Sequence, residues 1–266
     1  MAVKTDKFGN PKYMDKFYDR TTAEGVPDHN TIFRYSRDDN VTQTPKTVWS
    51  ENFNYIFPTT GEQWFIASDD VNDNATGTGL RKVVLFYHDS NREPGFEILT
   101  LNGTTPVGTV STDIFRFVAL TPNPGFIVGE VGSTGSNEGK IYIGTGTFTA
   151  GKPENIYGTI VPGKNVSQVG VDSTPANRQW AIHMNFWGVE AAKDCIFTFD
   201  LDLGGNGIFF NGGDFIVTAG STIVNWPYVI QILPGSDVRY TARSEQATSA
   251  LAFAILFHEM PFPLTD

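Results

Sequence analysis

The richest cluster of oxygen-bearing side chains lies in residues 69–74, which read DDVNDN. Asp70, Asn72 and Asn74 alternate at the spacing that carboxylate and amide ligands take in a calcium-binding loop. The next residue is alanine where an EF-hand needs glycine, and Arg81 stands where it needs a bidentate glutamate, so an EF-hand is excluded. We therefore expect a solvated turn here, with a calcium site of another kind as the alternative.

Two glycine-rich segments approach nucleotide-binding patterns without completing them. Residues 158–165 (GTIVPGKN) have the glycine and lysine spacing of a phosphate-binding loop, but Asn165 replaces the Ser or Thr that would bind magnesium. Pro162 also removes one backbone N–H from the loop. Residues 144–149 begin like a dinucleotide fingerprint, but Thr149 stands at the third glycine position. We expect turns or strands at both places and predict no cofactor.

The reactive side chains lack the spacing of a catalytic site. Cys195, the single cysteine, lies in an alternating apolar run, so we expect a buried thiol and no intramolecular disulfide. The four histidines, His29, His88, His183 and His258, are isolated from one another in the sequence and form no zinc-binding pair. No Gly-x-Ser-x-Gly motif offers an acyl-transfer serine. We predict that the protein is not an enzyme.

Tryptophan side chains offer one further chemistry, which is stacking on sugar rings. Trp187 is out of phase with Trp180 and Ile182, the residues that we expect to face inward on its strand. Trp187 and Trp226 are therefore the candidates for carbohydrate binding. Burial in the core or in a subunit contact is the commoner fate of such residues, and we keep sugar binding as the alternative.

Composition limits the partners that the protein can have. The net charge is −10 and no cluster of Lys and Arg is present, so we expect no direct nucleic-acid binding and no docking to an anionic membrane. No stretch of eighteen apolar residues predicts a membrane span. The first residues lack the apolar core of a secretory signal, so we expect synthesis in a cytoplasm without export by that route.

Residues 1–45 differ from the rest of the chain because they mix charges of both signs with scattered aromatic residues and follow no sustained period. The aromatic residues that we single out are Phe8, Tyr13, Phe17 and Tyr18. Two interpretations stay open. The segment is either a solvated leader or an arm that anchors the subunit by burying these aromatics against a partner subunit.

From Trp49 onward the apolar residues recur with a period of two, which predicts strands. The clearest segments are residues 82–87, 96–101, 114–118, 195–203 and 251–257. Both faces of the last segment are apolar, so we expect it at the centre of a sheet. The predicted fold is all-β, a β-sandwich or jelly-roll-like architecture, with an N-terminal arm (1–45) and two packed sandwich halves (46–150 and 151–266). Residues 144–163, rich in Gly, Thr and Pro, are the expected connection between the halves.

Four segments in order along the middle of the chain resemble a pattern in virion proteins of marine tailed bacteriophages and of some large algal viruses. They are residues 66–83 (IASDDVNDNATGTGLRKV), residues 100–107 (TLNGTTPV), the pair Phe115 and Arg116, and residues 132–141 (GSTGSNEGKI). The resemblance covers about residues 48–145 and assigns no catalytic residue. It implies a virion component of the head-decoration, knob or fibre-base type.

We therefore predict a viral structural protein that assembles in several copies on the virion, as a capsid or head-decoration protein or as a tail component. Its expected partners are copies of itself and other capsid or tail proteins, and its expected location is the virion. The first alternative is a carbohydrate-binding attachment protein that takes host-surface glycans at Trp187 or Trp226. The second alternative, a polysaccharide-degrading enzyme, has no motif to support it.

Overall fold

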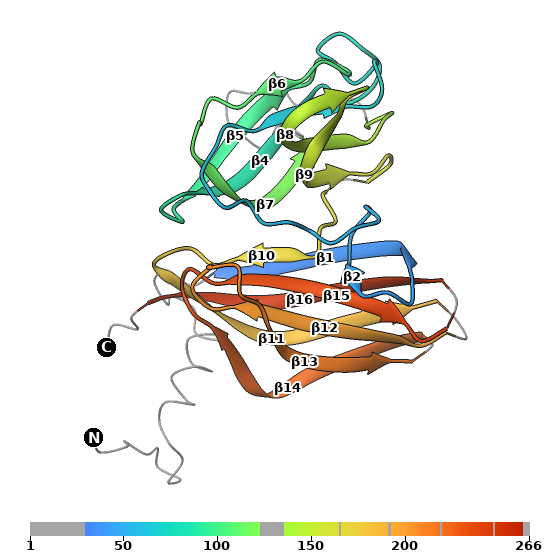
Figure 1. Cartoon of the computed structure of the whole chain (residues 1–266), viewed down its shortest axis with the longest axis vertical. Helices are drawn as coiled ribbons and strands as arrows, with labels where there is room; N and C mark the ends of the chain where they lie inside the picture. The colour runs from blue at the N-terminus through green and yellow to red at the C-terminus, as the bar shows by residue number, and fades with distance from the viewer. Residues whose placement is uncertain are drawn as a thin grey trace.

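The computed structural model describes residues 30–122, 136–164, 166–190, 193–218, 220–246 and 248–262, and these ranges contain strands and turns but no helix. None of them therefore holds a helix that could cross a membrane. The predicted all-β class is confirmed. The strands form four antiparallel sheets, and the sheets pack in pairs into two units, which we call the upper and the lower unit after their places in Figure 1.

The lower unit is a sandwich of two sheets. One sheet has the order β1-β16-β11-β14, and the other has the order β10-β15-β12-β13 with β2 added at β15. The strands are β1 (Asn30–Val41), β2 (Lys46–Thr47), β10 (Val171–Ser173), β11 (Arg178–Val189), β12 (Cys195–Asp202), β13 (Phe210–Val217), β14 (Gly220–Ile232), β15 (Asp237–Ser244) and β16 (Ser249–Pro261). Along β12, Cys195 and Phe197 are buried and Thr198 is not, which is the predicted alternation.

The last strand, β16, lies at the centre of its sheet as its apolar faces predict, because it pairs with β1 on one side and β11 on the other. Phe253 and Phe257 are buried against the facing sheet. Ala252 and Leu256 on the opposite face are only half-buried. The sequence predicted that both faces of this strand are covered, but the face that carries Ala252 and Leu256 is covered only in part.

The upper unit also consists of two sheets, with the orders β6-β3-β8-β9 and β5-β4-β7. The strands are β3 (Phe65–Ser68), β4 (Lys82–Asp89), β5 (Pro94–Thr100), β6 (Val107–Gly108), β7 (Ile114–Pro122), β8 (Ile141–Thr149) and β9 (Lys152–Ile160). Its core contains fully buried side chains from both sheets, among them Trp64, Leu85 and Ile143. The whole unit is inserted in the chain between β2 and β10 of the lower unit (Figure 1).

The sheets divide the chain differently from the predicted halves. Residues 30–41 of the predicted arm form β1, whose inward-facing residues include Arg34 and Ser36, and these polar side chains conceal the period of the strand. The predicted connection at 144–163 is largely the β8–β9 hairpin. Gly144 lets the two strands approach closely, because a Cβ there would lie 1.9 Å from the Asn155 carbonyl oxygen.

Candidate functional site

The two units are joined by a buried carboxylate at the start of β15. Asp237, in the lower unit, is 1% exposed and receives hydrogen bonds from two arginines of the upper unit. Arg116 Nη2 donates to Asp237 Oδ2 at 2.7 Å, and Arg92 Nη1 donates to Asp237 Oδ1 at 2.6 Å. Ser173 Oγ donates a further hydrogen bond of 2.7 Å. Burial alone would raise the pKa of Asp237, but the hydrogen bonds and charges of Arg116 and Arg92 outweigh it and hold the pKa below its ordinary value.

Aromatic rings support the same arginines. The guanidinium carbon of Arg116 lies 3.6 Å from the centroid of the Phe115 ring, and that of Arg92 lies 5.4 Å from it. Arg116 Nη1 also donates to the carbonyl oxygen of Pro58 at 2.6 Å. Because these polar groups are already engaged with one another, the cluster is suited to holding the two units together.

Further charged side chains continue this cluster between the units. Arg34 Nε on β1 donates to Asp172 Oδ1 on β10 at 2.5 Å, and Asp172 is 2% exposed. Burial raises the pKa of Asp172 to about 6 and is only partly offset by Arg34. Burial, followed by the charges of Arg92 and Arg34, lowers the pKa of His88 to about 4. We call these six side chains the buried charged layer: Arg34, His88, Arg92, Arg116, Asp172 and Asp237.

The predicted calcium candidates lie together in one loop of the upper unit, but their oxygens serve that loop. Asp70 Oδ1 accepts the Asn72 N–H at 2.8 Å, and Asn74 Oδ1 accepts the Gly77 N–H at 2.8 Å. Among the residues that the structure describes, no three His, Cys, Asp or Glu side chains are grouped to hold a metal ion. The solvated turn is the geometry present, and the calcium site stays a prediction.

Asp73 organises this loop, and the sequence interpretation passed over it. Its side chain is fully buried, and its oxygens accept the Ser68 hydroxyl at 2.6 Å and the Leu80 N–H at 2.7 Å. They also accept the N–H groups of Glu138 and Gly139, which bring a distant loop alongside. The sequence feature that could have indicated this role is the presence of glycines in the loop, because a residue without a side chain lets the backbone approach a buried carboxylate closely.

Trp187 is buried in the core, the outcome favoured over sugar binding in the sequence, so the alternative of sugar stacking at Trp187 is wrong for this fold. Its side chain is 3% exposed and packs against Phe197 and Phe215 in the lower core. A β-bulge between Ile182 and Met184 shifts the register of β11, and this turns Trp187 inward. Phe186 faces outward instead and is 37% exposed.

Two sets of predicted residues cannot be placed. Trp226 belongs to β14, but its side chain is outside the described part of the structure. The arm aromatics Phe8, Tyr13, Phe17 and Tyr18 are outside the described residues. Cys195 is fully buried, as its alternating run predicts.

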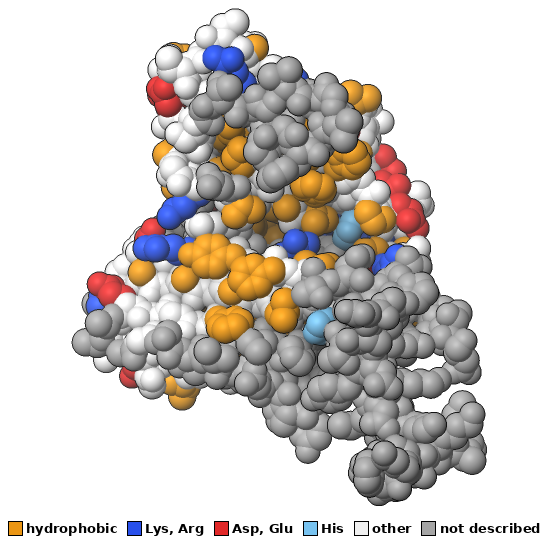
Figure 2. Space-filling view, turned by 180° about the vertical axis from the view of Figure 1, so that it is seen from behind, with side chains coloured by type: hydrophobic (Ala, Val, Ile, Leu, Met, Phe, Trp, Pro, Cys, Tyr) orange, Lys and Arg blue, Asp and Glu red, His pale blue; other side chains and the backbone are white. Residues whose placement is uncertain are grey.

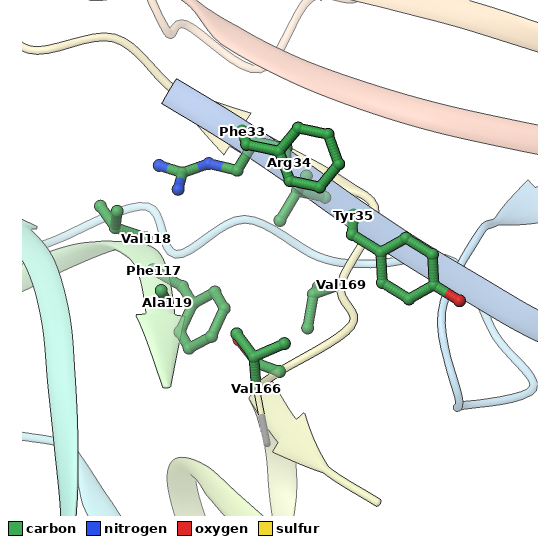
Figure 3. A pocket seen from close by; sticks show the side chains of 10 residues that line it. Phe33, Arg34, Tyr35, Phe117, Val118, Ala119, Val166 and Val169 are labelled. Atoms are coloured by element: carbon green, nitrogen blue, oxygen red, sulfur yellow. The ribbon is translucent and has the colours of Figure 1, made fainter. Parts of the chain in front are cut away.

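An apolar groove of about 370 Å³ lies where the units meet. Phe33 and Tyr35 of β1 form the wall contributed by the lower unit, while Phe117 and Ala119 of β7 line the opposite side with Val166 (Figure 3). Phe33 is 59% exposed and Val166 is 37% exposed. Seen from behind, the molecule carries a concentration of apolar side chains at the junction of the units (Figure 2). A groove that exposes this much apolar surface is a candidate contact site.

The fold and these two features define a class: an all-β protein of two sandwich units joined by buried ion pairs, with an apolar groove at their junction. No family model matches the chain, and no curated protein matches it. Among solved structures it is similar to that of infectious bursal disease virus Gx strain, with 11% identity, a TM-score of 0.25, and 94% of this chain and 79% of that chain covered. It is also similar to the empty virus-like particle of Cowpea Mosaic Virus, with 8% identity, a TM-score of 0.21, and 80% and 84% covered. These values are too low to establish a shared fold or a shared role.

Proposed function

We propose that the protein is a structural component of a virus particle and assembles there in several copies without catalysing a reaction. The strand order of the lower unit carries the proposal. Leaving out β2 and counting in chain order with β1 first and β10 second, its eight strands lie side by side in the order first-eighth-third-sixth in one sheet and second-seventh-fourth-fifth in the other. This order supports the interpretation of the unit as two interlocked Greek keys, the jelly roll on which many viral capsid domains are built.

The buried charged layer supports the proposal because a shell protein must present a fixed shape to its neighbours. Two arginines of the upper unit share one carboxylate of the lower unit, so rotation of one unit against the other would leave charges buried without partners. The units therefore act as one block. The likeness of residues 66–141 to marine bacteriophage virion proteins supports a decoration, knob or fibre-base position on such a particle.

Self-association of the purified chain tests the proposal directly. Its mass should be measured by size-exclusion chromatography with light scattering across a wide concentration range, together with electron microscopy of the largest species. We expect assemblies of several copies with a defined shape. A chain that stays monomeric at every concentration, both alone and with purified particles, would contradict the proposal.

A carbohydrate-binding attachment protein is the second candidate, because lectin domains share the jelly-roll order. With Trp187 in the core, Trp226 is the remaining tryptophan of the two proposed for sugar stacking. Binding on a glycan array that is lost in Trp226→Ala would favour this role. Trp187→Phe serves as the control, since a core substitution should leave such binding unchanged.

A further inference from the structure

The apolar groove is suited to an apolar occupant because its polar wall groups are already paired. Arg34 is held by Asp172, as described above. Ser167 donates its N–H to the Leu120 carbonyl at 2.8 Å and accepts the Leu120 N–H on its hydroxyl at 3.0 Å. A polar ligand would therefore find few partners here, whereas an aromatic side chain would cover Phe33 and Val166.

The chain itself contains such aromatic side chains, in the segment that precedes β1. Twenty-nine residues precede β1, and β1 forms the groove wall from its fourth residue, Phe33, onward. The aromatic residues of this segment are Phe8, Tyr13, Phe17 and Tyr18. They are followed by residues 19–29 (DRTTAEGVPDH), which contain no Phe, Tyr or Trp and no Leu, Ile or Met.

The length of this polar spacer sets how far from Asn30 the aromatic residues can reach. Fully extended, residues 19–29 span about 36 Å at roughly 3.3 Å per residue. The groove wall, in contrast, begins only three residues after Asn30, or about 10 Å along the strand. A spacer of that length allows the aromatic residues to pass the chain's own groove and enter one on an adjacent copy, and the proposed assembly in copies favours the neighbour's groove.

We propose that the aromatic segment of residues 8–18 docks into the groove between the two units of a neighbouring copy of this chain. The inference rests on the proposed function, because it requires assembly in copies, and it names the contact that holds them. An arm of one copy in the groove of the next is a head-to-tail contact, which closes into a ring or continues as a chain of subunits.

Cysteine cross-linking between isotopically distinct copies of the full chain tests the proposal. The variant Lys16→Cys with Val166→Cys places one thiol beside Phe17 and one at the groove. Cys195 is retained, since it is fully buried. Equal amounts of ¹⁵N-labelled and unlabelled protein are mixed and treated with a short bismaleimide, and the linked peptides are identified by mass spectrometry. We expect 16–166 pairs that join a labelled peptide to an unlabelled one.

A matched control replaces the groove position with Val110, which is 90% exposed, follows β6 and is not among the residues that line the groove. Lys16→Cys with Val110→Cys should give at least tenfold fewer pairs. Adding Phe17→Ser and Tyr18→Ser to the groove variant should reduce its pairs to this control level. Contacts between copies in an equal mixture make mixed pairs as frequent as single-isotope pairs, whereas an arm that covers its own groove gives single-isotope pairs alone. The absence of mixed pairs would therefore overturn the proposal, as would 16–166 pairs no more abundant than the control.

Assembly state separates this inference from the proposed function. If the chain forms assemblies of several copies while the 16–166 pairs stay at the control level, the arm contact is refuted and the proposed function stands. If the chain remains a monomer under every condition tested, both are refuted. If the arm contact holds the copies together, Val166→Asp raises the concentration needed for assembly at least tenfold, while Val110→Asp leaves that concentration unchanged.

Discussion

Arg116 of the upper unit donates from one guanidinium to both carboxylate oxygens of Asp237 in the lower unit, from Nε to Oδ1 at 3.0 Å and from Nη2 to Oδ2 at 2.7 Å. Both side chains are almost fully buried, and Arg92 reaches the same carboxylate. Two buried arginines at the junction of the units thus depend on a single acid for their counter-charge. A bidentate arginine–carboxylate pair has a fixed relative geometry, so it sets orientation as well as proximity.

Replacement of Asp237 should therefore be severe. In Asp237→Ala, two buried guanidinium groups lose their counter-charge, and we expect a loss of about 3–5 kcal/mol in the free energy of unfolding. Urea denaturation followed by tryptophan fluorescence measures this. Asp200→Asn is the control, because the Asp200–Arg239 pair is longer, at 3.3 Å, and more exposed. It should cost less than about 1 kcal/mol. Equal losses in the two variants would contradict the role of Asp237.

Asp172 and His88 should give the stability opposite dependences on pH. The folded pKa of Asp172, about 6, lies above its unfolded value, so the folded state binds the extra proton and Asp172 makes the fold more stable as the pH falls from 6 toward 4. The folded pKa of His88, about 4, lies below its unfolded value, so the unfolded state binds the extra proton and His88 makes the fold less stable over the same interval. Each contribution is on the order of 2 kcal/mol.

The two variants separate these effects. Relative to the native chain, Asp172→Asn should lose stability more steeply as the pH falls from 6 to 4, and His88→Gln should lose it less steeply. Urea midpoints measured at half-unit pH steps test both. Parallel curves for the native chain and the two variants would refute the assignment of this pH dependence to the buried charged layer.

Asp73 should matter more than the calcium candidate beside it. In Asp73→Asn, an amide N–H₂ replaces one acceptor oxygen among the surrounding donors, so we expect a loss of about 2–3 kcal/mol in unfolding free energy. Asp70→Asn removes charge from a half-buried turn and should cost less than about 1 kcal/mol.

Thermal melts of both variants with and without calcium also test the calcium prediction. Calcium stabilisation that Asp70→Asn abolishes would support a metal site.

Sequence alternation predicted the strands well where one face is apolar and the other polar, as in β12. It failed where a polar side chain faces inward, because Arg34 and Ser36 of β1 are satisfied by partners outside the strand, Asp172 and the Val48 carbonyl. It also failed at the bulge in β11, since one extra residue reverses the phase and no local feature announced it. The junction of the units was unpredictable for the same reason: Arg116 and Asp237 are 121 residues apart.

The inward turn of Trp187 leads to a prediction of its own. Trp187→Ala should leave a cavity among Phe197 and Phe215 and lower the free energy of unfolding by about 3–5 kcal/mol. Phe186→Ala, on the outward-facing neighbour, should cost much less. Chemical denaturation of both variants measures the difference. A small effect for Trp187 and a large one for Phe186 would show that β11 keeps its phase without a bulge.

Deletion of residues 1–29 tests whether the arm anchors the subunit. Burying two aromatic side chains contributes on the order of 10 kcal/mol before association costs, which are themselves about 4–15 kcal/mol. The net free energy of one arm contact is therefore close to zero. Firm attachment requires many such contacts made at once around a particle. We expect the shortened chain to keep its β-sheet circular-dichroism spectrum, because β1 is intact, and to lose assembly at concentrations where the full chain assembles. Replacing Phe8, Tyr13, Phe17 and Tyr18 together by serine should have the same effect, because the aromatics and not the chain length supply the contact. Full occupancy of particles by the shortened chain would refute the anchoring role.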